Sequence, residues 1–182
     1  VFAIGTFSSK VLSFLLVPLL SHALAPAEFS ITNMIVDMGN LLLPVVTLGI
    51  SNSIIRFGLE KSVRKSDVYA TGFATILAGF LLLLVLQPIL VPTLTPVMEI
   101  MEIEPQYVSQ YMMYLIAFVT VSSLRSLNSQ FTRARGMVRL FAVDGILSTF
   151  TTVLFSCLYI MVFHLGVVGY ISAIITSDAL ST

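Results

Sequence analysis

Polar residues recur along one face of an apolar segment in the first third of the chain. The polar or helix-disturbing positions there are Asn33, Asp37, Asn40, Pro44, Thr47 and Ser51. They are separated by steps of three or four residues, the spacing that keeps side chains on one side of an α-helix. At ~1.5 Å per residue the stripe is about 27 Å long, close to the ~30 Å hydrocarbon core of a bilayer. Because polar groups at that depth are costly unless they face protein or water, the pattern predicts a membrane helix that lines a path or binding site for something polar.

Apolar runs of similar length recur along the whole chain and predict six membrane helices. Their expected bounds are residues 1–24, 31–57, 68–94, 107–127, 143–164 and 166–182. The longest expected link is 126–142, and 164–166 is expected to be a tight hairpin. We therefore expect an all-α polytopic membrane protein, a six-helix transmembrane bundle that forms one lobe over residues 1–182. Both ends of the sequence are apolar, which indicates a fragment whose last helix is truncated.

Composition supports a membrane protein. Hydrophobic residues make up 57% of the chain and charged residues 10%, with a mean hydropathy of +1.02. Soluble domains average about 45–50% apolar and about 25% charged residues. The single cysteine, Cys157, cannot form an intrachain disulfide and is expected to be a small packing residue.

Most basic residues lie in two of the links between the expected helices, or at the ends of those links. Eight of the nine are Arg56, Lys61, Arg64, Lys65, Arg125, Arg133, Arg135 and Arg139. Both links lie on the same side of the membrane, and the opposite links contain no basic residue. The positive-inside rule makes the basic side cytoplasmic, which predicts a multi-pass plasma (inner) membrane protein with a cytoplasmic N-terminus. The basic links either determine topology alone or also attract anionic lipid headgroups or an anionic substrate.

Lys10 and Asp37 are charged residues inside expected helices. A lysine at the centre of a membrane helix costs roughly 2.5–3.5 kcal/mol on insertion scales, so Lys10 either snorkels to the interface or points into the bundle. In the second case it pairs with Asp37 or holds an anionic group. Asp37 is an ion-coupling candidate for H⁺ or Na⁺, and equally a structural partner of Lys10.

Further substrate-binding candidates are Arg56, Tyr114, Asn33 and Asn40. Arg56 ends the second expected helix, where a guanidinium either meets a phosphate or anchors the helix at the interface. Tyr114 shares a face of the fourth expected helix with Ser122 and Arg125, and a tyrosine that faces a cavity can stack on a sugar ring. Tyr107 and Tyr111, near the outer end, are more simply an aromatic belt.

Enzyme signatures are lacking in the sequence. His22 and His164 do not have metal-ligand spacing, and no Gly-rich phosphate loop or nucleophile elbow occurs. We therefore expect no enzyme activity, no cofactor, no metal and no nucleic-acid partner.

Three groups of segments carry a resemblance to a known family. They are residues 5–18 with 27–30; 40–44 with 47–50 and 56–57; and 133–136 with 141–146 and 165–170. Together they resemble the oligosaccharide flippases, or polysaccharide transporters, of the multidrug/oligosaccharidyl-lipid/polysaccharide (MOP) exporter superfamily. The likeness covers nearly the whole chain and rests on the order and spacing of motifs that are individually weak.

The resemblance implies a fold and a function. Such transporters have two six-helix lobes around a central cavity, and this chain would be the N-terminal lobe. The substrate would be an O-antigen or other polysaccharide unit linked by pyrophosphate to a polyprenol, flipped to the outer leaflet by alternating access. Lys10 and Arg56 would be the cationic partners of the pyrophosphate.

Three other functions remain open. A cation-coupled drug or small-molecule antiporter of the same superfamily would use Asp37 for the coupling ion. A membrane-embedded glycosyltransferase or polymerase would need a sizeable outer loop with charged catalytic residues, which the chain lacks. A purely structural membrane subunit would give no reason for the polar stripe.

Overall fold

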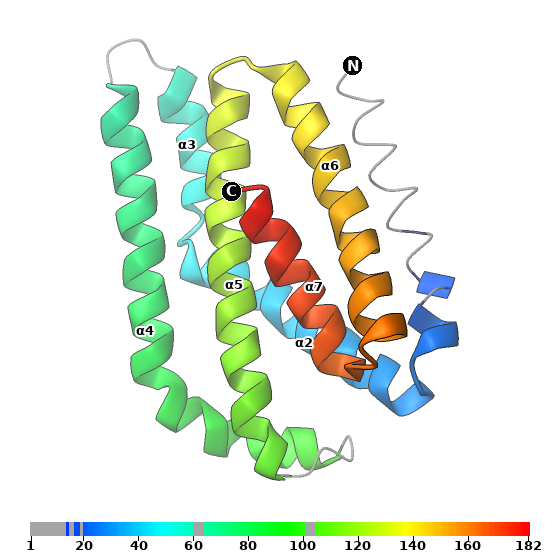
Figure 1. Cartoon of the computed structure of the whole chain (residues 1–182). Coiled ribbons are helices and arrows are strands. Elements are labelled where there is room, and N and C mark those ends of the chain that lie inside the picture. The colour runs from blue at the N-terminus through cyan, green and yellow to red at the C-terminus, as the bar shows by residue number, and fades with distance from the viewer. Residues whose placement is uncertain (1–13, 15–16, 19, 60–63, 101–104) are drawn as a thin grey trace.

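The described part of the chain is built from helices (Figure 1). The computed structural model describes residues 14, 17–18, 20–59, 64–100 and 105–182. Its elements are α2 (Pro26–Val46), α3 (Ile50–Leu59), α4 (Lys65–Ile100), α5 (Pro105–Ala134), α6 (Val138–Ser156), the π-helical turn η1 (Cys157–Val162) and α7 (Gly166–Leu180). Over these residues there is no strand, so the predicted all-α class is confirmed. The count of six helices stays a prediction, because most of the first expected helix lies outside the described residues.

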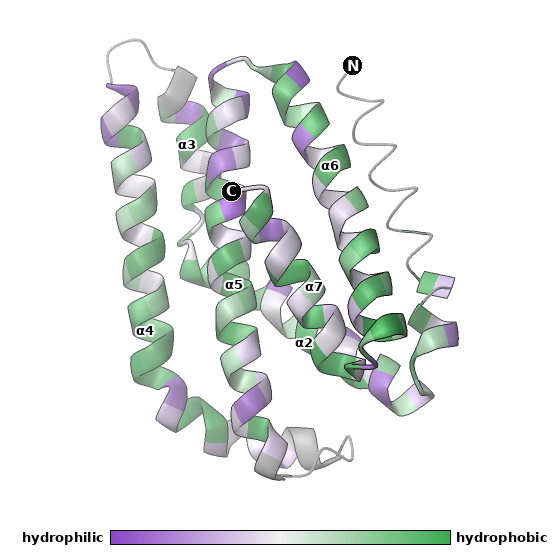
Figure 2. Ribbon diagram, viewed as in Figure 1, coloured by the Kyte–Doolittle hydropathy of each residue, from purple (hydrophilic) through white to green (hydrophobic). Residues whose placement is uncertain are grey.

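Four of these helical segments are long and apolar enough to cross a membrane. They are Pro26–Val46, Lys65–Thr93, Tyr107–Ala134 and Val138–Val162. Large apolar side chains point outward from them, as Val85 of α4 does with 72% exposure. Figure 2 shows this apolar character along most of the length of the ribbons. Since lipid tails solvate such a surface at no cost, the exposure fits a helical membrane protein.

Several helices, the second to the fifth of those expected, differ in extent from the sequence prediction. α4 begins at Lys65, and α5 continues to Ala134, so the polar residues expected to begin the longest link are helical. The second expected helix is divided by a turn after Val46, in which Leu48 and Gly49 have φ values of 49° and 65°. α2 itself begins earlier than expected because Pro26 occupies its first turn and the Glu28 carboxylate accepts the Ala25 N–H at 3.2 Å.

The expected hairpin before the last helix is confirmed, whereas the link expected over 126–142 shortens to residues 135–137, because α5 ends at Ala134 and α6 begins at Val138. Residues 163–165 separate η1 from α7, with φ of 52° at His164 and 54° at Gly166. The chain also reverses between α5 and α6, where Gly136 has φ of 75°. Glycine adopts this left-handed conformation without the steric cost that a Cβ atom brings.

The apolar core forms around α5. Ile35 of α2, Met112 and Phe118 of α5 and Ile171 of α7 belong to one buried cluster. Gly39 permits the close approach of α2, because a Cβ atom there would lie 2.3 Å from the Phe118 ring. This packing holds α2, α5 and α7 at fixed positions around the polar groups described below.

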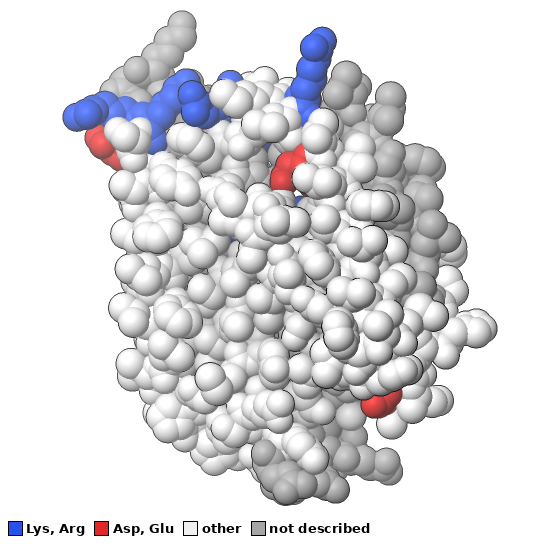
Figure 3. Space-filling model, viewed as in Figure 1, with Lys and Arg blue, Asp and Glu red and all other residues white. Residues whose placement is uncertain are grey.

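Basic side chains gather at one end of the bundle, as the sequence predicts (Figure 3). Arg56 lies in the last turn of α3, Arg133 in the last turn of α5, and Lys65 begins α4. Lys61 lies outside the described residues. Arg125 is an exception to the expected loop position: it lies inside α5, nine residues before Ala134. At ~1.5 Å per residue this places it about 13 Å along the axis from the helix end.

Candidate functional site

A polar cavity of about 540 Å³ lies between α2, α5, α6 and α7, next to the segment that precedes α2. Ligand pockets in proteins usually range from about 300 to 1,000 Å³. Its polar lining comes from Asn33, Asn40, Ser122, Arg125, Ser126, Ser129, Gln130, Ser148, Thr149, Thr152, Tyr170 and Asp178. Amides, hydroxyls, a phenol and one charge of each sign therefore face one space inside a bundle with an apolar exterior.

Helical spacing explains how two helices supply most of this lining. α2 contributes Phe29, Asn33, Val36, Asn40 and Leu43, which follow one another at steps of four and three. α5 contributes residues from Phe118 to Gln130 with the same periodicity. Such steps place side chains on one face, so each helix turns a mixed polar face to the cavity and other faces to the core or outward.

Arg125 and Asp178 form an ion pair within the cavity wall. The Nη1 atom of Arg125 lies 3.2 Å from Oδ1 of Asp178, and their side chains are 28% and 7% exposed. Ser122 donates a hydrogen bond to the other carboxylate oxygen of Asp178, and Arg125 Nε donates to Ser181 Oγ at 3.4 Å. The pair thus joins α5 to α7 at a depth where an isolated charge is costly.

A second carboxylate lies next to this pair. Ser181, which accepts from Arg125, donates its own hydroxyl hydrogen to Asp144 of α6. The cluster therefore contains one guanidinium and two carboxylates, from three different helices. Neighbouring hydroxyls are satisfied among themselves: Ser177 Oγ donates to the Ser148 carbonyl at 2.7 Å and accepts from Thr152 at 2.8 Å.

Gln130 contains a buried polar atom without a partner. Its Oε1 atom is inaccessible to solvent and receives no hydrogen bond from the described residues. A buried acceptor left without a donor costs about 1–3 kcal/mol. The residue lines the cavity towards the basic end of α5, with this oxygen turned away from the accessible space.

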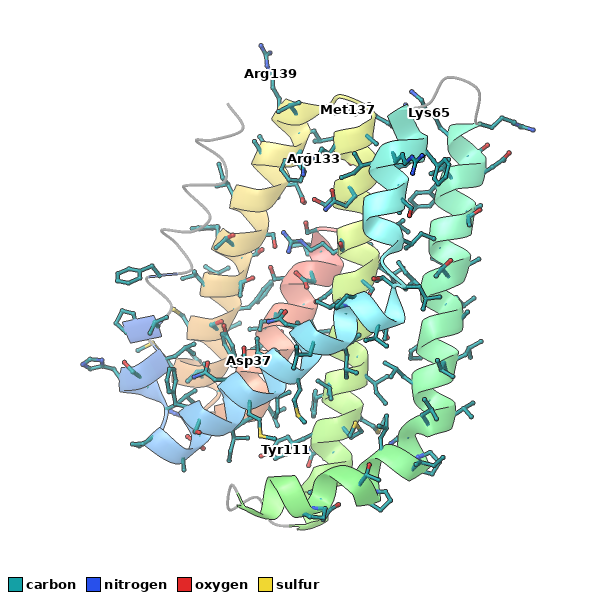
Figure 4. The ribbon with its side chains drawn as sticks, turned by 180° about the vertical axis from the view of Figure 1, so that it is seen from behind. Asp37, Lys65, Tyr111, Arg133, Met137 and Arg139 are labelled. Atoms are coloured by element: carbon teal, nitrogen blue, oxygen red, sulfur yellow. The ribbon has the colours of Figure 1, made fainter. Side chains whose placement is uncertain are left out.

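The residues predicted from the sequence fall in different places. Asn33 and Asn40 both line the cavity. Asp37 is exposed on a neighbouring face of α2, between the two ends of the bundle that Arg139 and Tyr111 mark in Figure 4. Lys10 lies outside the described residues, so its expected pairing with Asp37 is not placed.

The other two candidates lie away from the cavity. Tyr114 is half-buried against the apolar core cluster around α5. Arg56 is exposed at the end of α3, with its guanidinium 5.9 Å from the centre of the Phe57 ring.

Sequence reasoning missed the cavity role of Arg125 and Asp178. Its clustering with the other basic residues places Arg125 at the edge of a link, whereas α5 continues past it and the polar residues that follow lie on the cavity face of α5. Asp178 is a lone carboxylate in an apolar run, which is by itself the signal of a functional or paired residue. No group of three or more potential metal-ligating side chains occurs within the described ranges.

Comparison with known proteins gives no relative: the chain matches no known family, no curated protein and no solved structure.

Proposed function

We propose that the chain is the N-terminal lobe of an inner-membrane transporter that flips polyprenyl-pyrophosphate-linked oligosaccharides to the outer leaflet. The observation that carries this proposal is a cavity with many polar lining residues between helices whose outer faces are apolar. Amides and charges inside a membrane protein cost free energy, and a path or binding site for a polar group accounts for their presence there. The motif resemblance to MOP-superfamily flippases supplies the substrate class.

The cavity chemistry suits a sugar phosphate. Asn33, Asn40 and several hydroxyls offer both donors and acceptors to sugar hydroxyl groups. Tyr170 offers an aromatic ring, and Arg125 offers the planar set of donors that binds phosphate oxygens. A six-helix lobe with its basic end in the cytoplasm would receive such a substrate from the side on which it is made.

The orientation of the lining supports entry from the basic end. The cavity residues of α5 run from Phe118 to Gln130, towards the end where Arg133 and Lys65 lie. A cytoplasmic basic end would attract the anionic pyrophosphate before it reaches Arg125. Alternating access would follow from rocking of this lobe against a second one.

The test uses the full-length protein in its native host. Asn33→Leu and Asn40→Leu remove cavity amides at similar volume, and we expect each to reduce surface polysaccharide at least about tenfold, the loss that ~1.4 kcal/mol produces. Val85→Ala, on an exposed face of α4, is the matched control and should leave export unchanged.

Membrane abundance of each variant is measured by immunoblotting so that folding is separated from transport. Normal surface polysaccharide with both cavity variants at normal abundance would refute the flippase proposal. Unchanged polysaccharide together with altered drug sensitivity would instead support the antiporter of the same superfamily.

A further inference from the structure

Arg125 has hydrogen-bonding capacity that the described residues do not use. A guanidinium carries five N–H donors and does not deprotonate in proteins. Two atoms are engaged, Nη1 with Asp178 and Nε with Ser181. The Nη2 group makes no hydrogen bond to the described residues, and the side chain is 28% exposed to the cavity that it lines.

The contact between Arg125 and Asp178 is far from saturated. It is a single bond of 3.2 Å, whereas charge-assisted N–H···O bonds are usually about 2.7–2.9 Å and arginine–carboxylate pairs are often bidentate. Asp178 also accepts a hydrogen bond from Ser122, and this bond depends neither on Arg125 nor on a ligand in the cavity. The carboxylate therefore keeps one partner if the guanidinium turns away.

We infer that Asp178 is an internal counter-ion that occupies the anion position of Arg125, and that a phosphate group enters the cavity by displacing it. The inference rests on the proposed function, because it assigns the binding of the substrate's pyrophosphate to Arg125. Phosphate oxygens can accept the donors of Arg125 in a bidentate arrangement that the single bond to Asp178 lacks.

The counter-ion also makes the site selective. One guanidinium faces Asp178 directly and Asp144 through Ser181, so a small anion such as inorganic pyrophosphate should bind only weakly. A ligand that binds tightly must offer several acceptor oxygens and further contacts beyond those that replace the carboxylate. A pyrophosphate joined to a sugar provides both, and its sugar would meet Asn33 and Asn40, which line the same cavity from α2.

The test measures binding of inorganic pyrophosphate to the purified full-length protein in nanodiscs by titration calorimetry. Asp178→Asn has the same shape and keeps an oxygen for Arg125, while its amide can face the Ser122 hydroxyl. Removal of the competing charge should tighten binding at least about tenfold. Arg125→Gln, alone or combined with Asp178→Asn, should abolish it, and Arg139→Gln, at the exposed end of α6, should leave it unchanged.

Equal or weaker binding by Asp178→Asn, or normal binding by Arg125→Gln, would overturn the inference. The Asp178→Asn result does not depend on the folding of Arg125→Gln, because tighter binding requires a folded protein. A second titration, with a short-chain polyprenyl pyrophosphate, distinguishes failure of the counter-ion inference from failure of the proposed function. If Asp178→Asn tightens the binding of inorganic pyrophosphate but the protein does not bind the polyprenyl pyrophosphate, Asp178 is a counter-ion and the substrate is not lipid-linked. If Asn33→Leu and Asn40→Leu lose export while Asp178→Asn leaves pyrophosphate binding unchanged, the flippase proposal stands and the counter-ion inference is wrong.

Discussion

At the scale of single residues, the cavity wall is organised by an ion pair and by the hydroxyls bonded to it. Arg125 is held between Asp178 and Ser181, and Asp178 is held between Arg125 and Ser122. Each partner offsets part of the desolvation of the other, so removal of one side chain leaves the other under-compensated. This mutual dependence predicts a strongly non-additive response to mutation.

Arg125→Ala should destabilise the protein by about 3 kcal/mol, because it leaves Asp178 buried without its cation. The double variant Arg125→Met with Asp178→Leu should recover most of that loss, since apolar side chains of similar size need no partner. The measurement is a double-mutant cycle on unfolding free energies of the purified protein in detergent. Additive losses from the two positions would show that the two side chains do not interact in the folded state.

The prediction of single residues from the sequence succeeded where polar residues also recurred at helical spacing. Asn33 and Asn40 stand out because they interrupt an apolar helix at helical spacing, and both line the cavity. Asp178 lies near the end of an apolar helix, on the same face as Tyr170 and Ile174. Its partner comes from α5, 53 positions earlier in the sequence, and periodicity within one segment does not reveal such a contact.

At the scale of elements, the turn between α2 and α3 is the clearest departure from a continuous membrane helix. Pro44 lacks the N–H group that a helix interior needs, and the chain leaves helical geometry three residues later. The Gly49 N–H donates to the Pro44 carbonyl at 3.1 Å, which satisfies one acceptor that the helix end leaves open, and Thr47 Oγ1 adds a second bond to the Leu43 carbonyl at 2.8 Å. The sequence marks Pro44 as a helix-disturbing position, and its apolar run does not show where the helix breaks.

Gly49→Ala tests whether this turn requires a left-handed residue. Gly49 has φ of 65°, and a Cβ atom there would meet nothing within 4 Å, so any cost comes from the backbone alone. We expect a loss of roughly 1–2 kcal/mol in unfolding free energy. Gly49→Asn is the matched control and should cost less, because asparagine tolerates this conformation. Equal stability of the glycine and alanine proteins in detergent unfolding would contradict the turn.

Helix ends were hardest to predict where polar residues face inward. The segment after Arg125 contains several serines, an asparagine and a glutamine, and hydropathy alone assigns such a stretch to a link. Ser126, Ser129 and Gln130 instead line the cavity from within α5. The hydropathy of a helix reports its average surroundings, so it fails for a helix with one face in a polar cavity.

At the scale of the whole molecule, the distribution of polar and apolar side chains is partly the reverse of that in a soluble domain. The outer faces carry large apolar side chains, while polar groups concentrate in an internal cavity and at the basic end. The sequence predicted the helical class and the clustering of basic residues, since both follow from local composition. The cavity depends on contacts between α2, α5, α6 and α7, which no single segment encodes.

The central claim is that the polar faces of α2 and α5 meet in an internal chamber that water enters. Single cysteines at Asn40 and Ser129, in a full-length protein with Cys157→Ala, test it most directly by labelling with a polar maleimide in intact membranes. Matched cysteines at Val85 and Leu147, both exposed on the outer surface, are the controls. We expect rapid labelling at Asn40 and Ser129 and little at Val85 and Leu147. Rapid labelling of the two outer positions with protection of the two inner ones would contradict the account.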